Sequence, residues 1–362
     1  MTRLLPMNAK QPVVSRQPYE TWARHLKATA DPLRLLVLRV LRQQSYGVLE
    51  LSHLLDIQQS RLSHHLKILT QAELLTQRRE GNSIFYQRHP APQGWAQTVF
   101  STVDQWPLPE PVAQAAQAIA EERRTQAEAF FARHAADFRR RQDLIAEYPQ
   151  YAEQALALLD QVSADHARHH ALEVGPGLGE FLQPLSERFE RVDAVDISTE
   201  LLDAAATANA GRGIRFTRGD LKHWQATYNE RPDLLVYNMV LHHIPNPEAE
   251  LRRAGSVLSA EGFLLVTDLC RHDHAWAREN CGDQWLGFSL EDLTHWAAPA
   301  GLALTRHSVT ALRNGFQVQC LLLQKLPTTE TNTPHQPVSP MQANEAVAAT
   351  AEFELSEKDK PL

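Results

Sequence analysis

Three glycines at every second position follow a short apolar run, and this pattern limits the folds that the chain can adopt. The run 171–174 is apolar apart from Glu173, and Gly175, Gly177 and Gly179 come directly after it. Glycine permits backbone conformations that other residues disfavour and lets the main chain approach a ligand closely. A helix that follows such a turn points its first N–H groups at the same place. The segment therefore predicts a strand, a ligand-binding turn and a helix.

The sequence beyond this turn alternates between strand-like and helical patterns. Short runs rich in β-branched and other apolar residues are separated by segments with helical spacing, as expected for repeated βα units. We expect strands at residues 170–174, 191–196, 214–218, 233–238, 262–269, 302–308 and 317–324. This order favours an α/β doubly wound, Rossmann-like sheet, in which ligands bind at the carboxyl ends of the strands.

The first third of the chain carries a different pattern. Asp31 followed by Pro32 marks the start of a helix, with Asp as the capping residue and Pro at the first helical position. Further helices are expected near residues 48–55 and 58–72, and two strand-like runs then flank the turn Glu80-Gly81-Asn82. Helix, turn, helix and β-hairpin in this order predict an α+β winged helix-turn-helix domain.

The helix expected near residues 58–72 has the composition of a DNA-recognition helix. Glutamine pairs with adenine, arginine pairs with guanine, and serine and lysine side chains contact phosphates. Arginines beside the hairpin turn, including Arg88, are suited to the flanking DNA backbone. The predicted DNA-binding residues are Gln59, Ser60, Arg61, Ser63, His64, Lys67, Arg78 and Arg79.

Charge is unevenly distributed along the 362 residues. Residues 1–110 hold 13 Lys/Arg and 8 Asp/Glu, a net charge of +5, whereas the remainder holds 23 Lys/Arg and 35 Asp/Glu, a net charge of −12. A basic end attracts a polyanion and an acidic body repels it, so the charge agrees with DNA binding at the N-terminal end.

Composition also predicts the setting and the division of the chain. Three cysteines make no disulfide framework, no run of 18 apolar residues is present, and the first residues lack a secretory signal. We therefore expect a cytoplasmic protein without a membrane partner. The expected divisions are a flexible arm (1–17), a winged helix-turn-helix domain (18–106), a linker and connector helix (107–148), a ligand-binding domain (149–326) and a disordered acidic tail (327–362).

The N-terminal part resembles the ArsR/SmtB family of winged-helix regulators. The resemblance rests on Asp31-Pro32-Leu33-Arg34-Leu35, on Gln59-Ser60-x-x-Ser63-His64-His65-Leu66-x-x-Leu69, and on Arg79-Glu80-Gly81. It implies a homodimer that is held by the first and last helices of the domain and reads an inverted repeat in operator DNA. Metal-sensing members carry a Cys-x-Cys pair ahead of the recognition helix, and this chain has none there. We therefore expect no metal ligands.

The C-terminal part resembles class I S-adenosylmethionine-dependent methyltransferases. Its glycine spacing differs from the dinucleotide pattern G-x-G-x-x-G, which leaves an NAD-type site as the weaker alternative. The resemblance implies that Asp196 binds the ribose hydroxyls, that Asp220 faces the adenine amine and that Asn238 lies beside the methyl-bearing sulfur. The implied cofactor-binding residues are Glu173, Gly175, Gly177, Gly179, Asp196, Ile197, Asp220, Leu221 and Asn238.

Two histidines after the fourth expected strand are candidates for catalysis. His242 and His243 can act as general bases, or they can simply close the pocket. The segment Tyr237-Asn238-Met239-Val240 lacks the Pro-Pro-aromatic pattern used for amino-group methylation, so methylation of DNA bases is disfavoured.

Three functions follow from this combination of domains. The whole chain resembles S-adenosylhomocysteine-responsive regulators, which implies a transcription factor whose operator affinity depends on S-adenosylmethionine or S-adenosylhomocysteine. The alternative is an active methyltransferase of a small molecule, with the DNA-binding domain serving autoregulation. A metal-responsive regulator is the third hypothesis.

Overall fold

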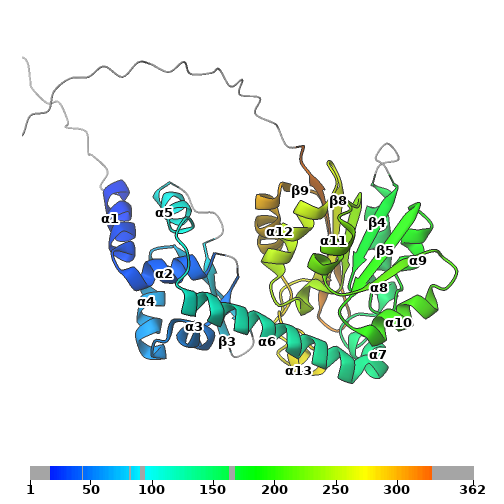
Figure 1. Cartoon of the computed structure of the whole chain (residues 1–362), viewed down its shortest axis with the longest axis horizontal. Coiled ribbons are helices and arrows are strands. Elements are labelled where there is room, and N and C mark those ends of the chain that lie inside the picture. Colours follow the sequence, from blue (N-terminus) through cyan, green and yellow to red (C-terminus); the bar gives the residue numbers. More distant parts are fainter. Residues whose placement is uncertain (1–16, 43, 81–82, 90–93, 163–167, 328–362) are drawn as a thin grey trace, which may run out of the picture. The chain divides into compact units, whose positions relative to one another are not determined.

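The computed structural model describes residues 17–42, 44–80, 83–89, 94–162 and 168–327, and Figure 1 shows their helices and strands. The predicted N-terminal arm and acidic tail lie almost wholly outside these residues. These described residues group into one unit by their contacts. None of the helices in the described ranges is both long enough and apolar enough to cross a membrane.

The N-terminal elements form a winged helix-turn-helix, as the sequence predicts. A three-stranded antiparallel sheet of order β1-β3-β2 follows and flanks the helices. The short first strand was not predicted. The elements are α1 (Gln17–Thr29), α2 (Pro32–Val40), β1 (Tyr46–Gly47), α3 (Val48–Leu55), α4 (Gln59–Gln71), β2 (Leu75–Glu80), β3 (Ser83–Arg88) and α5 (Trp95–Val103).

Local capping fixes where these helices begin and end. The Asp31 carboxylate accepts a hydrogen bond from the Arg34 backbone N–H at 3.0 Å, and Pro32 occupies the first helical position of α2. Glu50 reaches back to the backbone N–H of Gly47 at 2.7 Å and caps α3. Asp56 adopts a left-handed conformation and ends α3. Fully buried leucines from α2, α3 and α4 then form the core of the domain.

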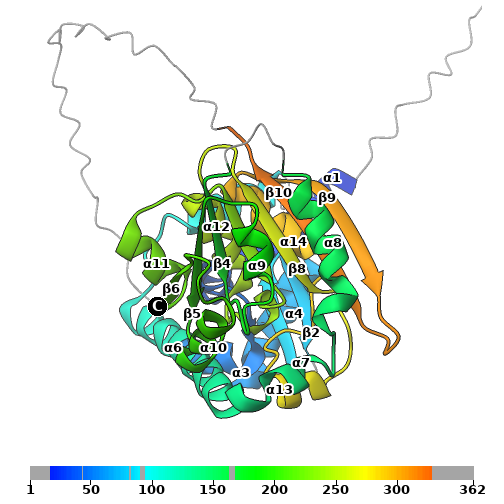
Figure 2. The ribbon, with the colours of Figure 1, turned by 90° about the vertical axis from the view of Figure 1, so that its right-hand side faces the viewer.

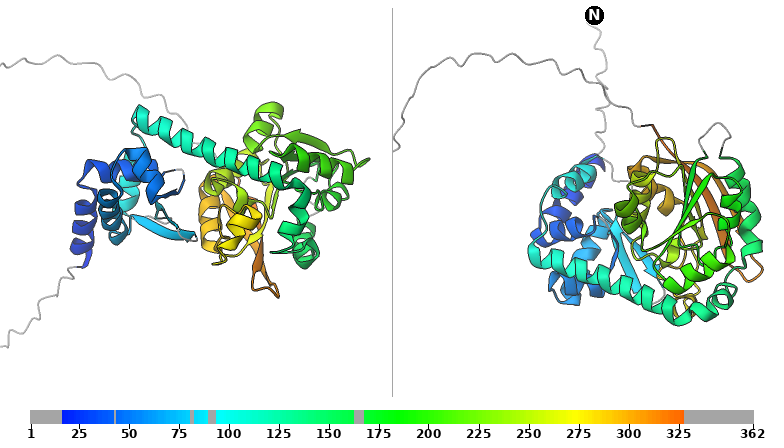
Figure 3. Two further views of the ribbon diagram at one scale, coloured as in Figure 1. Left: turned by 90° about the horizontal axis from the view of Figure 1, so that it is seen from below. Right: turned by 45° about the vertical axis from the view of Figure 1, so that its right-hand side comes forward.

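A long helix connects the two domains. Helix α6 (Glu110–His134) is unbroken over its 25 residues, as Figure 3 shows, and the short elements η1 (Ala135–Asp137), α7 (Phe138–Gln142) and α8 (Tyr148–Asp160) follow it. The sequence predicted continuous helix up to about residue 148, and that boundary is wrong. The helix ends at His134, and the following turn brings the Phe138 ring to 6.1 Å from the Phe131 ring. A straight helix would separate these residues by about 10 Å along its axis.

The C-terminal domain has a seven-stranded sheet of order β6-β5-β4-β7-β8-β10-β9. The first five strands in this order are parallel, and β10 runs antiparallel to both β8 and β9. This is the doubly wound, Rossmann-like sheet that the sequence predicts. The strands are β4 (His170–Val174), β5 (Arg191–Asp196), β6 (Arg215–Arg218), β7 (Leu234–Asn238), β8 (Phe263–Leu269), β9 (Leu302–Ala311) and β10 (Gln317–Lys325).

Helices cover both faces of this sheet (Figure 2). Because successive side chains of a strand point to opposite faces, Leu235 and Tyr237 pack with α11, α12 and α14, whereas Leu234 and Val236 pack with α8, α9 and α10. The sheet therefore sits between two apolar layers. The remaining elements are α9 (Leu182–Ser186), α10 (Thr199–Ala208), α11 (Leu221–Tyr228), η2 (Leu241–His243), α12 (Pro247–Val257), α13 (Trp276–Cys281), α14 (Leu290–Ala297) and η3 (Ala298–Ala300).

Candidate functional site

A cavity of about 270 Å³ lies at the carboxyl ends of β4, β5 and β7. Its wall includes the predicted residues Gly175, Gly177, Asp196, Ile197 and Asp220. In doubly wound sheets this edge is where ligands bind. The position of the cavity therefore follows from the topology of the sheet.

The three glycines of the turn have positive φ angles of +68°, +55° and +79°. A Cβ atom on Gly175 would lie 2.3 Å from a methyl group of Val240, and one on Gly179 would lie 2.6 Å from the side-chain nitrogen of Asn209. Gly177 and Gly175 line the cavity, whereas Gly179 packs against α10 away from the wall. Each glycine is thus required, but Gly179 serves helix packing rather than ligand contact.

Two acidic side chains stand at the ends of adjacent strands. The Asp196 carboxylate accepts a hydrogen bond from the Ser198 backbone N–H at 2.8 Å. Burial raises the pKa of Asp196 to about 6, and hydrogen bonds from backbone N–H groups, including that of Gly177, limit the rise. Asp220 caps α11 by accepting a hydrogen bond from the His223 backbone N–H at 2.7 Å. Both carboxylates face the same cavity.

Four predicted cofactor residues do not line this cavity. Glu173 is buried behind the turn, and among the described residues its Oε2 atom has no hydrogen-bond partner. Burial, followed by the charge of Asp196, raises the pKa of Glu173 to about 8. Leu221 belongs to the apolar core below α11, and the side-chain oxygen of Asn238 is buried without a hydrogen-bond partner in the described part of the chain. With Gly179, these residues support the wall from behind.

One wall of the cavity comes from a segment that the sequence interpretation treated only as a connector. Helix α6 contributes Ala120, Arg124, Ala127 and Phe131. Their spacing of four, three and four residues places them on one face of the helix. That spacing was available in the sequence, but no motif marked it, because alanine at these positions is common in any helix.

The two candidate catalytic histidines have different surroundings. The Nδ1 atom of His242 lies 2.8 Å from the Asp268 carboxylate, and His242 does not line the large cavity. Burial disfavours a charge on His242, but the Asp268 and Asp283 carboxylates outweigh this effect and raise its pKa to about 9. His243 does line the cavity, and burial together with the charge of His242 lowers its pKa well below the usual value. Of the pair, only His243 is placed to meet a ligand there as a neutral imidazole.

The recognition helix α4 presents a polar face. The side chains of this helix that the sequence predicts to contact DNA are all exposed. Leu62, Leu66 and Leu69 are buried in the core of the domain. His65 is buried as well, with Nδ1 3.7 Å from the Asp31 carboxylate. The exposed predicted residues of this helix are Gln59, Ser60, Arg61, Ser63, His64 and Lys67.

The sequence predicts that Arg78 of the hairpin binds DNA, and the structure contradicts this prediction. This side chain is only 3% exposed, forms an ion pair with Glu80 and donates a hydrogen bond to the carbonyl of Gly287 in the C-terminal domain. It is therefore withdrawn from DNA, because a buried, paired guanidinium cannot reach a phosphate. Arg88 is likewise engaged, with a bidentate pair to Asp104 at 2.6 and 3.1 Å. Arg79 is exposed.

Comparison with known families agrees with this two-part architecture. The family described as "Methyltransferase domain" matches residues 119–311, which is more than half of the chain. The chain belongs to the methyltransferase domain family. In the same chain, residues 31–77 match the family described as "Bacterial regulatory protein, arsR family". The protein thus joins an ArsR-family helix-turn-helix to a methyltransferase domain, as the resemblances implied.

Individual relatives cover one part or the other. An uncharacterized methyltransferase of Mycobacterium bovis is 28% identical over 167 residues, which is 44% of this chain and 84% of that protein. An arsenic resistance transcriptional regulator of Pseudomonas putida is 33% identical over 78 residues, covering 21% of this chain and 61% of the regulator. Among solved structures, the N-methyltransferase NodS of Bradyrhizobium japonicum in complex with S-adenosyl-L-homocysteine is 18% identical, with a TM-score of 0.44 over 55% of this chain and 98% of NodS.

Proposed function

We propose that this protein is a DNA-binding transcriptional regulator whose methyltransferase domain binds S-adenosylmethionine or S-adenosylhomocysteine and thereby changes operator affinity. The observation that carries the proposal is the position of α6. One face of this helix forms the wall of the cavity, and another part of it belongs to the core of the winged helix-turn-helix. A ligand in the cavity would therefore touch the element that supports the DNA-binding domain.

The cavity suits an adenosyl ligand. Asp196 and Asp220 provide two carboxylates, which accept hydrogen bonds from hydroxyl and amino groups. Gly175 and Gly177 keep the main chain free of side chains beside them, and the apolar side chains of Ile197 and Val240 lie on the same wall. Polar groups at one end and apolar groups around them are typical of a small-molecule site.

Helix α6 is tied to the winged helix-turn-helix by both apolar and charged contacts. Val112 and Ile119 are buried in the core of that domain. Arg123 donates hydrogen bonds to the Glu50 carboxylate of α3 at 2.6 to 2.9 Å. Ala120, one residue after Ile119, already lines the cavity. A displacement of α6 by ligand would therefore reach α3, which packs directly against the recognition helix.

The hairpin provides a second connection between the domains. Glu80 accepts a hydrogen bond from the Leu286 backbone N–H at 2.7 Å, and Arg278 donates one to the Glu80 carbonyl at 3.1 Å. The Phe85 ring lies 5.2 Å from the Trp285 ring in an edge-to-face contact. These contacts hold β2 and β3 to the methyltransferase domain. The proposed ligand response thus has two routes to the DNA-binding surface.

The proposal includes a homodimer. Tyr19, Trp22 and Leu26 recur at helical spacing on α1 and are exposed. Exposed large apolar residues that share one helix face are typical of an interaction surface. We assign this face to the second copy of the chain, in line with the dimer implied by the ArsR resemblance. Light scattering should show a dimer for the wild type and a monomer for Leu26→Glu, and a dimeric Leu26→Glu variant would contradict this assignment.

The regulatory proposal is tested by measuring operator affinity with and without each nucleoside. A fluorescence anisotropy titration on the DNA upstream of the coding region would be repeated with S-adenosylmethionine and with S-adenosylhomocysteine. Coupling between sites is typically about 1–3 kcal/mol, or roughly 5- to 150-fold in affinity. We expect a shift in this range with at least one of them, and no shift in Asp196→Asn. Calorimetric binding of both nucleosides without any change in operator affinity would overturn the proposal.

The same protein preparation addresses methyl transfer. Membership of the methyltransferase domain family is compatible with S-adenosylmethionine-dependent catalysis. Conversion of S-adenosylmethionine in the presence of small-molecule acceptors, lost in His243→Gln, would show an enzyme. Nucleoside-dependent operator binding without any turnover would show a sensor.

A further inference from the structure

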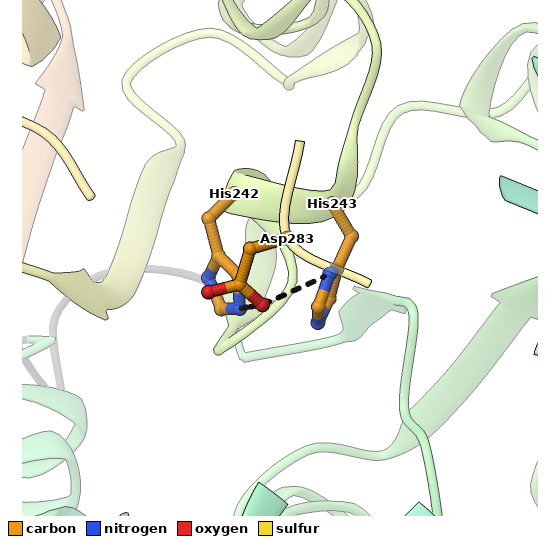
Figure 4. A group of neighbouring side chains, drawn as sticks. All are labelled: His242, His243 and Asp283. Carbon is orange, nitrogen blue, oxygen red and sulfur yellow. Dashed lines mark ion pairs between the residues drawn. The ribbon is translucent and has the colours of Figure 1, made fainter. Parts of the chain in front are cut away.

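A second, smaller group of polar side chains lies next to the nucleoside cavity. His242 and His243 come from η2, and Asp283 follows the left-handed Gly282 that ends α13. In Figure 4 the Asp283 carboxylate overlaps the His242 imidazole, and dashed lines mark its ion pairs with both histidines. Its Oδ1 atom lies 3.8 Å from the Nε2 atom of His242 and 3.8 Å from the Nδ1 atom of His243. The three ligand-type atoms are mutually within 4.8 Å.

Asp283 is a buried carboxylate with only two long ion pairs and no hydrogen bond among the described residues. It is 3% exposed, and within the described part of the chain neither of its oxygens has a hydrogen-bond partner. Removing a carboxylate from water is costly unless a positive charge or several donors replace the lost solvation. The separation of 3.8 Å from each imidazole nitrogen is too long for a hydrogen bond. The group is therefore arranged around a position that a cation would complete.

His242 has the orientation of a metal ligand. Its Nδ1 atom is held at 2.8 Å by Asp268, a fully buried carboxylate that also accepts a hydrogen bond from the Leu269 backbone N–H at 2.7 Å. In metal sites a carboxylate commonly fixes one imidazole nitrogen so that the other faces the ion. Here the other nitrogen, Nε2, faces Asp283.

We propose that His242, His243 and Asp283 bind a divalent transition-metal ion of the zinc type. Two imidazoles with one carboxylate suit zinc and its neighbours, whereas magnesium and calcium prefer oxygen ligands throughout. Tetrahedral ligands about 2.1 Å from zinc lie roughly 3.4 Å apart. The two 3.8 Å separations from Asp283 therefore need to contract by a few tenths of an ångström, and the separation of the two imidazole nitrogens, which is at most 4.8 Å, by no more than about 1.4 Å. The ion replaces the hydrogen bond between His243 and the Gly282 carbonyl, which is 3.2 Å long.

The site has room beside it and a connection to the larger cavity. A cavity of about 10 Å³, the space of one water molecule, borders all three ligands. Three protein ligands leave a coordination position for water or substrate, as in catalytic zinc sites. His243 and Met239 line both this space and the nucleoside cavity. The ion would thus sit directly behind the wall of the nucleoside site.

A second group of similar composition has carboxylates that are already paired with arginines. His170, Asp193 and Glu230 also bring three ligand-type atoms within 4.8 Å. Two arginines already neutralise its carboxylates: Arg215 pairs with both Asp193 and Glu230, and Arg191 pairs with Glu230. No cation is needed there, which makes this cluster the matched control.

The test is direct titration of zinc into the full-length, tag-free protein after removal of metal with a chelator. We expect one zinc ion per chain, a loss of affinity of at least tenfold in Asp283→Asn, and an unchanged stoichiometry in His170→Gln. Asp268→Asn should weaken binding by about 10- to 100-fold, the usual effect of removing the partner of a metal-bound histidine. No zinc binding by the wild type, or full affinity in Asp283→Asn, would overturn the proposal and assign the cluster to a proton held between carboxylates.

X-ray absorption of the zinc-loaded wild type tests the ligands without any variant. We expect two imidazoles and oxygen in the first coordination sphere. A zinc–sulfur contact would place the ion on a cysteine such as Cys281, which borders the small cavity, and would contradict the proposed site. Neither readout involves DNA or nucleoside, so the outcome is independent of the regulatory proposal.

Discussion

Around the cavity of about 270 Å³, one carboxyl group is buried and three residues have positive φ angles, both of which are unfavourable for most residues. Glu173 is buried beside Asp196, and the turn that follows it has three glycines with positive φ. Such features cost stability, and they gather at functional sites. Their measurable consequences are a pH dependence of stability and an intolerance of small substitutions.

Glu173 should make the free protein less stable at alkaline pH. Its folded pKa of about 8 lies above the ordinary value of 4.5, so the folded state binds its proton more tightly than the unfolded state does. The stabilising contribution is complete below pH 4.5 and is lost as the pH rises through 8. Glu173→Gln keeps the neutral form at every pH. We expect this variant to exceed the wild type by roughly 3–5 kcal/mol at pH 9, because the folded and unfolded pKa values differ by about 3.5 and each pKa unit corresponds to about 1.4 kcal/mol.

Urea unfolding at pH 4 and at pH 9 measures this difference. The two proteins should have similar stabilities at the lower pH and separate at the higher one. Parallel pH profiles for the wild type and Glu173→Gln would show that Glu173 is already ionised in the folded protein.

Gly175 should be the least replaceable glycine of the turn. In Gly175→Ala the new methyl group meets Val240 at 2.3 Å, and the φ angle of +68° adds strain. Gly211→Ala is the matched control, because its φ is +81° but no atom lies within 4 Å of the added Cβ. We expect the control to cost about 1–2 kcal/mol from backbone strain alone. Gly175→Ala should cost more and also abolish nucleoside binding in calorimetry. Equal effects of the two substitutions would show that the Val240 contact is unimportant.

At the scale of elements, the sequence was informative where local chemistry decides the structure. Capping by Asp31 and the alternation of apolar strands located most helices and strands, because both signals lie within a few residues. The long helix was misjudged at its end, because the contact between Phe131 and Phe138 that accompanies the turn is tertiary. The wall formed by α6 was missed for the same reason.

The cluster of His242, His243 and Asp283 also depends on tertiary structure that the sequence does not reveal. Asp283 lies 40 residues beyond His243 and on a different element, so no spacing rule joins them. The sequence predicted no metal ligands, since that expectation depended on the absence of thiolates ahead of the recognition helix. Only the fold places the loop after α13 beside η2.

Helix α6 should transmit ligand binding through Arg123. In Arg123→Ala the ion pair with Glu50 is lost, but the residues that line the nucleoside cavity are unchanged. We expect nearly normal nucleoside affinity together with a coupling free energy reduced by about 0.5–2 kcal/mol, the usual effect of mutating a residue between two sites. Operator affinity with and without nucleoside measures this coupling. Glu122→Ala, an exposed change on the same helix, is the control, and equal coupling in both variants would exclude the Arg123 route.

At the scale of the whole molecule, the distribution of charge and the docking of the hairpin together determine which cations can meet DNA. The N-terminal 110 residues carry a net charge of +5 and the remainder −12, so DNA is attracted to one end. Within that end the fold pairs Arg78 and Arg88 with carboxylates, and Arg78 is also buried. Near the recognition helix, Arg61, Lys67 and Arg79 are cations that the structure leaves exposed.

The salt dependence of operator binding should distinguish Arg79 from its neighbour Arg78. Each phosphate contact that is lost lowers the slope of log affinity against log salt by about 1. We expect this decrease for Arg79→Gln and an unchanged slope for Arg78→Gln, because the Arg78 guanidinium is buried against Gly287 and Glu80. Arg78→Gln should instead lower stability by about 3–5 kcal/mol, since it leaves Glu80 buried without its partner. The slope is the decisive quantity, because a loosened hairpin can change affinity without changing the number of phosphate contacts. A decrease of about 1 in Arg78→Gln, with none in Arg79→Gln, would mean that the hairpin leaves the methyltransferase domain when DNA is bound.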